Sequence, residues 1–267
     1  MTKPSKRPKS DYAIQTVTNA LSLLEAFQDE EELGVSELSR LLGLHKNNVF
    51  RLLATLEERG YVEQAPRSDR YMLGARCLEF SQALARRHGL LRLARPLLRE
   101  LGRRTAESAH LGVLRDLEVV HLDGAPGEGL VKACLRVGQR LPVHCTALGK
   151  ALLAFSDDGL RQALDRMRGA DGRLEERTRA TLVDREKLLE DLGTVRVRGF
   201  SLDLEECESG LRCVAAPVLD AEGRGVAALS LSAPAFRADP ETLESRLAPE
   251  VMAVAERLSR SLGYPTA

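Results

Sequence analysis

Three consecutive segments near the start of the chain repeat apolar residues at the spacing of an α-helix. They cover residues 16–27, 35–43 and 46–59. Apolar side chains that recur every three or four positions lie on one face of a helix, so three such helices can share a core. Ser36 is the predicted N-cap of the second helix, and Gly43 favours the left-handed turn that ends it. The predicted buried positions are Val17, Ala20, Leu21, Leu24, Phe27, Leu38, Leu41, Leu42, Val49, Leu52, Leu53 and Leu56.

A predicted β-hairpin follows the three helices. Two short strand-like runs, residues 61–64 and 70–74, flank the polar turn APRSD. Arg67 and Arg70 make the hairpin basic, and we predict that both contact DNA. Three helices and a hairpin, with a tight turn between the second and third helix, form the order of a winged helix-turn-helix domain. The predicted divisions are a flexible basic arm over 1–11, a DNA-binding domain over 12–74, a linker helix over 75–88 and a further domain over 89–264.

The third helix carries the polar side chains expected of a DNA reader. Its apolar face turns inward, which leaves Asn47, Asn48, Arg51 and Thr55 on the outer face. Asparagine pairs with adenine and arginine with guanine in the major groove, where the first turns of such a helix reach the base edges. Lys46 and the helix N-terminus suit phosphates. Asparagine near a helix start can also act only as a cap or turn residue, but the adjacent basic hairpin favours DNA reading.

Composition and charge limit the classes of protein that this chain can belong to. The 39 basic and 39 acidic residues exclude a uniformly basic nucleic-acid protein but still allow a local basic surface. The arm at 1–11 is one such surface, and it could be a solvated tail or could touch phosphates. Five cysteines without a CxxC pair indicate reduced thiols. No apolar run approaches the roughly 18 residues that span a bilayer, and the basic start lacks the apolar stretch of a signal peptide. We therefore expect a cytoplasmic protein without a membrane partner.

From Gly89 onward the pattern changes to strands that alternate with helices. Several strands are joined by hairpin signals, which favours an antiparallel α+β domain. The predicted helices cover 90–108, 146–155, 159–169, 183–199 and 243–263, and the predicted strands lie within 109–125, 130–138 and 210–234.

Several motifs resemble the IclR family of bacterial transcription regulators. VSELSRLLGLHKNNVFRLLATLEERGYVEQ and RYMLG are similar to its DNA-binding domain. ESAHLGVLRDLEVVHLD, VGQRLPVHCTALGKALLAF and RGFSLDLEECESGLRCVAAPVLDAEGRGVAALSLSAP are similar, in the same order, to its effector-binding domain. The resemblance covers about residues 12–263 and implies a ligand-responsive regulator with a winged helix-turn-helix domain and a GAF-like α+β domain. Many members have Ser or Thr in place of Asn47 and Asn48, so the operator sequence cannot be transferred.

The segment HCTALGKALLAF is the predicted site of an anion. Thr146 can cap a helix whose first amides belong to Ala147, Leu148 and Gly149, and free amides at a helix start attract a carboxylate. Ala147 and Gly149 are small enough to let a ligand approach the backbone, although an ordinary capped helix would have the same sequence. The resemblance implies that a small organic acid binds at Leu130, Ala133, Ala147, Leu148, Asp203, Leu211, Cys213, Ser230 and Ser232.

The chemistry of these residues leaves some roles open. Ser230 and Ser232 alternate along a strand, so both hydroxyls lie on one face. Asp203 could accept a hydrogen bond from a ligand hydroxyl or could hold its loop through backbone amides. Cys213 is expected to be a small buried thiol, either at the ligand or only in the core.

An enzyme or a metal protein is the alternative class. His144 and the cysteines at 134, 145, 207 and 213 invite a thiol-catalysis or metal interpretation. Catalysis needs a positioned base and a metal needs three or four converging ligands, and the sequence shows neither spacing. We therefore predict no catalytic activity, no metal, and no cofactor beyond a small organic-acid effector, while a redox-sensing cysteine stays open.

The expected partners are a double-stranded DNA operator, the effector and further copies of the chain. Paired DNA-binding domains read two half-sites, which predicts a dimer at least, and tetramers are common in the family that the chain resembles. The first helix and the linker helix near Leu78, Phe80 and Leu84 are the predicted pairing surfaces. The effector is expected to change the placement of the paired readers; activator or repressor stays open.

Overall fold

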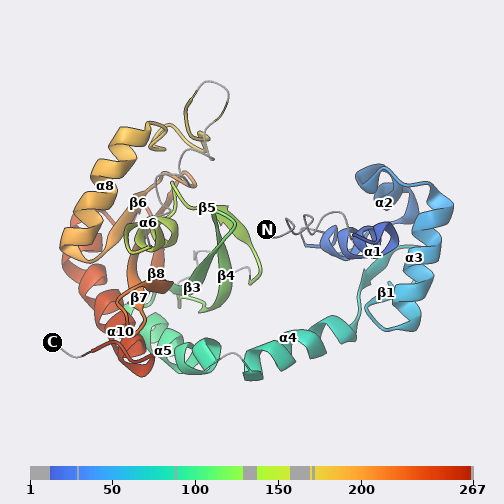
Figure 1. Ribbon diagram of the computed structural model, residues 1–267, viewed down its shortest axis with the longest axis horizontal. Helices are drawn as coiled ribbons and strands as arrows, with labels where there is room; N and C mark the ends of the chain where they lie inside the picture. Colours follow the sequence, from blue (N-terminus) through green and yellow to red (C-terminus); the bar gives the residue numbers. More distant parts are fainter. Residues whose placement is uncertain are drawn as a thin grey trace, which may run out of the picture. The chain divides into compact units, whose positions relative to one another are not determined.

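The computed structural model describes residues 13–28, 30–87, 89–128, 137–156, 169 and 172–265, except for the side chains of residues 82 and 84–87. Two compact units divide the chain, Met1–Arg87 and His88–Ala267 (Figure 1). Most of the predicted helix over 159–169 and most of the predicted strand over 130–138 lie outside the described residues, as do Leu130 and Ala133. No helix in the described parts of the chain is both long enough and apolar enough to cross a membrane.

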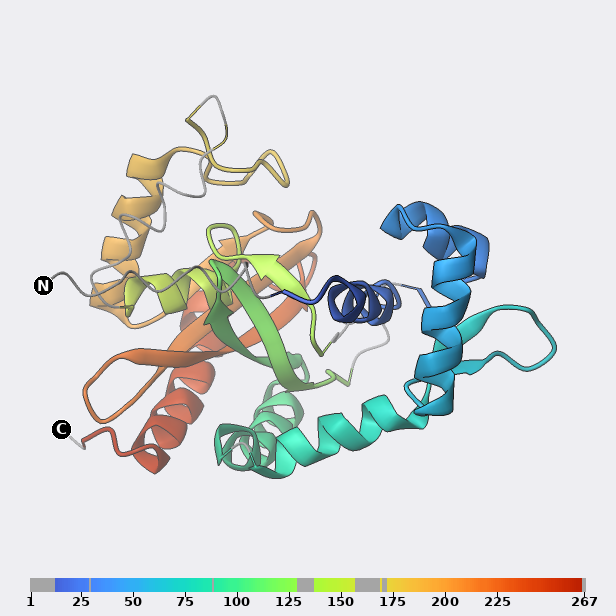
Figure 2. The ribbon, with the colours of Figure 1, turned by 45° about the vertical axis from the view of Figure 1, so that its right-hand side comes forward.

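Three helices and a hairpin form the compact part of the first unit, as the sequence predicts. The hairpin strands pair antiparallel beside α3 (Figure 2). A bridge from Leu33 to Tyr71 adds a third short stretch of backbone. The core is made of Leu23, Phe27, Leu33, Leu38, Val49, Leu53, Val62 and Tyr71. The elements are α1 (Gln15–Glu25), α2 (Val35–Leu42), α3 (Lys46–Glu58), β1 (Val62–Gln64), β2 (Tyr71–Leu73) and α4 (Ala75–Arg87).

Some predicted buried positions of this unit are wrong. Val17 and Leu21 are each more than half exposed, and Leu23 is the fully buried residue of α1. Leu41 is also exposed, because the core side of the short helix α2 is centred on Leu38. The apolar residues of these helices therefore outnumber the positions that the core can take.

The predicted N-cap of α2 is also wrong. The N-cap lies two residues earlier, at Gly34, and Ser36 lies inside the first turn of the helix. The Gly34 amide donates a hydrogen bond to Glu37 Oε2 at 2.8 Å. A carboxylate at this position satisfies a free amide at the helix start, so Glu37 replaces the expected serine cap.

The second unit is built on one antiparallel sheet, in agreement with the predicted α+β class. Its six described strands lie in the order β5-β4-β3-β8-β7-β6. The strands are β3 (Ser108–Arg115), β4 (Glu118–Ala125), β5 (Arg140–Pro142), β6 (Ser201–Leu204), β7 (Leu211–Leu219) and β8 (Gly225–Pro234). The helices are α5 (Gly89–Thr105), α6 (Ala147–Ala154), α8 (Arg185–Arg198), α9 (Pro240–Thr242), the π-helical turn η2 (Leu243–Leu247) and α10 (Ala248–Ser261).

Helices cover both faces of this sheet (Figure 1). The helices α5 and α10 pack on one face and are joined by ion pairs such as Arg104–Glu250, at 2.8 Å. The helix α6 packs on the other face, with α8 against it. Strand alternation divides β8 between these layers: Leu229 and Leu231 face one side, while Ser230 and Ser232 face the other.

The helix α6 lies unusually close to the chain that precedes it. A Cβ atom at Gly149 would lie 2.2 Å from the carbonyl oxygen of Val143 and 2.4 Å from its Cα. The interpretation that Gly149 is small to admit a ligand is therefore wrong, because the space is taken by backbone. Close packing of two backbone segments requires the glycine here.

We predict that Gly149→Ala destabilises the protein by more than about 3 kcal/mol, because the backbone of Val143 must move to admit a methyl group. The matched control is Gly193→Ala in the interior of α8, where a Cβ meets no atom within 4 Å. That change should be neutral or stabilise by up to about 1 kcal/mol. Urea unfolding of both variants tests this, and equal midpoints for the two would contradict the close-packing explanation.

Candidate functional site

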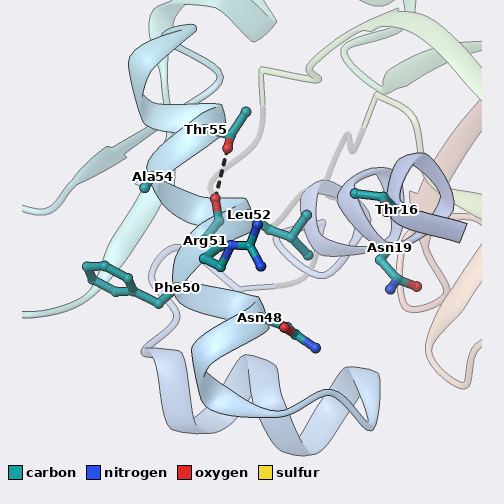
Figure 3. Close-up of a pocket in the computed structure, with 8 residues that line it drawn as sticks. All are labelled: Thr16, Asn19, Asn48, Phe50, Arg51, Leu52, Ala54 and Thr55. Atoms are coloured by element: carbon teal, nitrogen blue, oxygen red, sulfur yellow. Dashed lines mark hydrogen bonds between the residues drawn. The ribbon is translucent and has the colours of Figure 1, made fainter.

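The outer face of α3 gathers exposed polar side chains. Lys46, Asn47, Asn48, Arg51 and Thr55 are all solvent-exposed on this helix. Asn48, Arg51 and Thr55 border a surface depression of about 470 Å³ that Thr16 and Asn19 of α1 complete (Figure 3). The Thr55 hydroxyl donates to the Arg51 carbonyl at 2.9 Å, which holds it against the helix. The amides and the guanidinium group are thus presented outward from a rigid element.

Sequence reasoning missed two exposed residues of the same helix. Phe50 is 54% exposed, and Phe50 and Ala54 point away from Asn48 in Figure 3. With Asn47 and Arg51 they form an i, i+3, i+4, i+7 row. The sequence contains a signal for the exposure of Phe50, because the helical spacing that buries Val49 and Leu53 must turn position 50 outward. Phenylalanine and alanine in such a row suit the methyl group of thymine.

The two hairpin arginines have different surroundings. Arg67 is exposed in the turn, where its backbone has φ of 67°. Arg70 instead lies 2.9 Å from Glu37 Oε2 and donates to the Glu32 carbonyl at 2.8 Å. The pKa of the Glu37 carboxyl is lowered, first by the Gly34 amide and also by Arg70. Arg70 therefore fastens the hairpin to α2, and only Arg67 extends freely from the turn.

In the second unit a cavity of about 600 Å³ lies between the start of α6 and the sheet. The predicted effector residues that fall within the described part of the chain all line it: Ala147, Leu148, Asp203, Leu211, Cys213, Ser230 and Ser232. Leu130 and Ala133 lie outside the described residues. Other lining residues are His110, His121, Gln139, Leu141, Thr146, Arg177, Cys207, Glu208, Ser209, Gly210 and Pro234.

The start of α6 presents backbone amides to this cavity. Thr146 caps the helix: its hydroxyl oxygen accepts from the Gly149 amide at 3.2 Å and donates to the Pro142 carbonyl at 2.8 Å. The amides of Ala147 and Leu148 have no acceptor among the described residues, and both residues line the cavity. A carboxylate would satisfy these amides and would be stabilised by the helix dipole.

Asp203 holds the loop at the cavity rim. It is 2% exposed, and its Oδ1 accepts from the amides of Glu206 and Cys207 at 2.7 and 3.3 Å. The sequence leaves two roles open for Asp203, a hydrogen bond to a ligand hydroxyl or to the backbone amides of its loop, and these contacts are of the second kind. Burial raises the pKa of Asp203 to about 7, against the lowering effect of the Glu206 amide.

A buried lysine fixes the same loop to two helices. Lys150 of α6 is 2% exposed, and its Nζ lies 2.6 Å from Glu206 Oε1 and 3.0 Å from Asp191 Oδ2 of α8. Burial raises the pKa of Glu206, and Lys150 opposes that rise. A lysine in an amphipathic pattern normally predicts an exposed position, so this contact could not be expected from the sequence.

Three of the described cysteines, Cys145, Cys207 and Cys213, lie in the second unit. Burial raises the pKa of Cys213, whose Sγ lies 3.1 Å from Ser232 Oγ, as expected for a buried thiol at the cavity wall. An interaction between the Cys145 and Cys207 thiols raises the pKa of Cys145 and lowers that of Cys207. Among the described residues, no three His, Cys, Asp or Glu side chains could together hold a metal ion. Cys134 lies outside them.

Both units match models of one family. Residues 16–66 match the IclR helix-turn-helix domain, and residues 82–260 match the model described as bacterial transcriptional regulator IclR C-terminal. The chain belongs to the IclR family of bacterial transcription regulators. It is therefore a DNA-binding regulator with a C-terminal ligand-binding domain, and not an enzyme.

Relatives of this IclR-family chain resemble it over nearly its whole length. The HTH-type transcriptional regulator XynR of Escherichia coli is 38% identical over 253 residues, which are 94% of this chain and 98% of XynR. A transcriptional regulator from Rhodococcus sp. RHA1 has a TM-score of 0.82 at 28% identity, covering 94% of this chain and 98% of that one. An IclR homologue from Microbacterium hydrocarbonoxydans, solved in complex with 4-hydroxybenzoate, has a TM-score of 0.76 at 25% identity, covering 92% and 99%.

Proposed function

We propose that this regulator reads its operator with the exposed face of α3 and responds to a small organic acid that binds at the start of α6. The observation that carries the first part is that Asn47, Asn48 and Arg51 are all exposed on the helix that follows the tight turn at Gly43. Arginine and asparagine on the first turns of such a helix can pair with guanine and adenine. Lys46 and Arg67 suit the phosphates that flank these bases. Arg70 acts indirectly, by fixing the hairpin.

We predict that Arg51→Ala weakens operator binding by about 1 to 3 kcal/mol and relaxes the preference at one base pair, because it removes a base contact. Arg59→Ala is the matched control: Arg59 is exposed at the opposite end of the same helix and should affect all sequences equally and weakly. Binding assays on the operator and on single-base variants measure both effects. An unchanged footprint and unchanged base preference in Arg51→Ala would place the reading face elsewhere.

The oligomer is proposed to form through apolar side chains that the first unit leaves exposed. Val17 and Leu21 of α1 are exposed together with Ile14 at its N-cap, and Leu78 and Phe80 are exposed on α4. Exposed apolar side chains of this kind mark surfaces that pair with another protein, and a symmetric dimer would place two α3 helices on two half-sites.

We predict that Leu21→Glu shifts the chain toward smaller assemblies and lowers operator affinity, since it places a charge among the exposed apolar side chains of α1. The control is Glu25→Gln, which changes an exposed charge one turn further along the helix. Sedimentation velocity at matched concentrations distinguishes the two. Identical sedimentation of parent and Leu21→Glu would remove α1 from the proposed interface.

The effector is proposed to be an organic acid whose carboxylate binds the amides of Ala147 and Leu148. The support is the pair of amides without acceptors at the cavity wall, next to the serine hydroxyls at 230 and 232. The Microbacterium homologue, whose structure contains the acid 4-hydroxybenzoate, adds to this support. The regulator needs no other cofactor in this scheme.

We predict that the affinity for the tightest-binding acid of a small monocarboxylate panel falls by about 10-fold between pH 6 and pH 8. Ionised Asp203 repels a carboxylate in the same cavity, and with a pKa of about 7 it is mostly protonated at pH 6 and mostly ionised at pH 8. Binding therefore takes up a proton, and affinity is lost as the pH rises. Calorimetry at both pH values measures the loss.

The control for this pH dependence is Asp203→Asn, which keeps an oxygen for the Glu206 and Cys207 amides but carries no charge. The variant should bind the acid equally at both pH values. Arg177, Glu208 and Cys207 also line the cavity, so the difference between parent and variant isolates the contribution of Asp203. An equal loss of affinity in parent and variant would show that another group controls the binding.

A further inference from the structure

Two buried histidines form part of the cavity wall. His110 and His121 are 3% and 8% exposed, and their rings meet edge to face with centroids 5.4 Å apart. Both line the cavity beside the start of α6. The Nδ1 atoms of both rings are buried and have no hydrogen-bond partner among the described residues. Each ring therefore has one nitrogen that the described part of the fold leaves without a partner.

A β-bulge puts both rings on the same face of the sheet. The pairing of β3 with β4 runs from Leu111 opposite Asp123 directly to Gly112 opposite His121, so β4 carries one extra residue. The extra residue reverses the alternation of β4, and His121 joins His110 on the side of α6. Gly112 lies on this side too, since a Cβ there would be 3.0 Å from Leu148 Cδ1.

Buried polar atoms without a partner are costly to a fold. An interior position of this kind normally holds an aliphatic residue, as Val119 does on the same strand. Two imidazoles with unpaired nitrogens at one cavity are instead what a polar ligand requires, because the ligand can supply the missing hydrogen bonds.

We propose that His110 and His121 form a hydroxyl-binding subsite, so that the effector is a hydroxylated organic acid with its carboxylate at the start of α6. The inference rests on the proposed effector role of this cavity and names the ligand class. Ser230, Ser232 and Gln139 line the same cavity and supply further partners for hydroxyl groups.

The charge state of the pair separates a hydroxyl group from a second carboxylate. Burial lowers the pKa of His110 to about 3, with a further lowering by His121, and burial lowers the pKa of His121 to about 4. Both rings are therefore neutral near pH 7. A neutral imidazole has one donor and one acceptor nitrogen, which matches a hydroxyl group, whereas a carboxylate can only accept and favours a charged partner.

Three six-carbon acids test the subsite by calorimetry on the full-length protein: hexanoate, gluconate and adipate. They share a carboxylate and a chain length but differ in having no further polar group, several hydroxyl groups or a second carboxylate. Gluconate should bind at least about 10-fold more tightly than either of the others, because the other two leave the imidazoles unpaired or mismatched. Binding of all three with equal affinity would refute the subsite and leave the carboxylate site intact.

Two substitutions at one position assign the preference to the pair. His110→Phe keeps the ring volume but cannot bond a hydroxyl, so gluconate should lose its advantage while hexanoate binds as before. His110→Gln keeps a donor and an acceptor and should retain part of the advantage. The control is His144→Gln: His144 is buried outside the cavity lining, with its Nε2 bonded to the Glu175 carbonyl at 2.8 Å, and the preference should persist.

The outcomes distinguish the subsite from the proposed function that it rests on. Operator binding by each variant confirms that the chain is folded. If none of the three acids binds to protein that still binds operator, the organic-acid effector itself is wrong and the subsite falls with it. If gluconate is preferred equally by the parent and by His110→Phe, acids do bind but the histidines do not select them.

Discussion

The close packing of α6 against its surroundings is the constraint on which the ligand-binding unit depends. Every residue of this helix is buried, and its glycine at 149 lies against the backbone of Val143. Lys150, from the same helix, is enclosed by two carboxylates from α8 and the loop after β6. These contacts fix the first turn of the helix, so its free amides point to one side of the cavity. The proposed anion site would thus follow from how tightly one short helix is held.

The sequence predicts the elements of the DNA-binding unit and their order well, because these depend on local patterns. Helical spacing, the glycine at 43 and the hairpin signals are each contained within a few residues, and the DNA-binding unit follows from them. Strand alternation likewise places Ser230 and Ser232 on one face, where the structure has them. The predicted cap at Thr146 is confirmed for the same reason, since a cap involves only the residues next to it.

Features that depend on distant contacts could not be predicted in this way. The exposure of Leu21 and Leu41 depends on how much core the other helices supply. The contact of Arg70 with Glu37 joins residues that are far apart in sequence. The histidine pair depends on a bulge that reverses one strand, and a one-residue shift of register moves every following side chain to the other face. The family resemblance therefore identified seven of the residues that line the cavity, and the histidine pair that the bulge brings together was missed.

The relative size of two free energies limits how a ligand in the cavity can act on the rest of the regulator. Breaking a buried ion pair such as Lys150–Glu206 costs about 3 to 5 kcal/mol, because a charge is left unpaired in the interior. Coupling between a ligand and a distant site is typically about 1 to 3 kcal/mol. A ligand can shift an equilibrium only by its differential affinity for the two states, so an effector of ordinary strength cannot break this pair. The helix α6, the rim loop and α8 are therefore expected to respond to the proposed effector as one group.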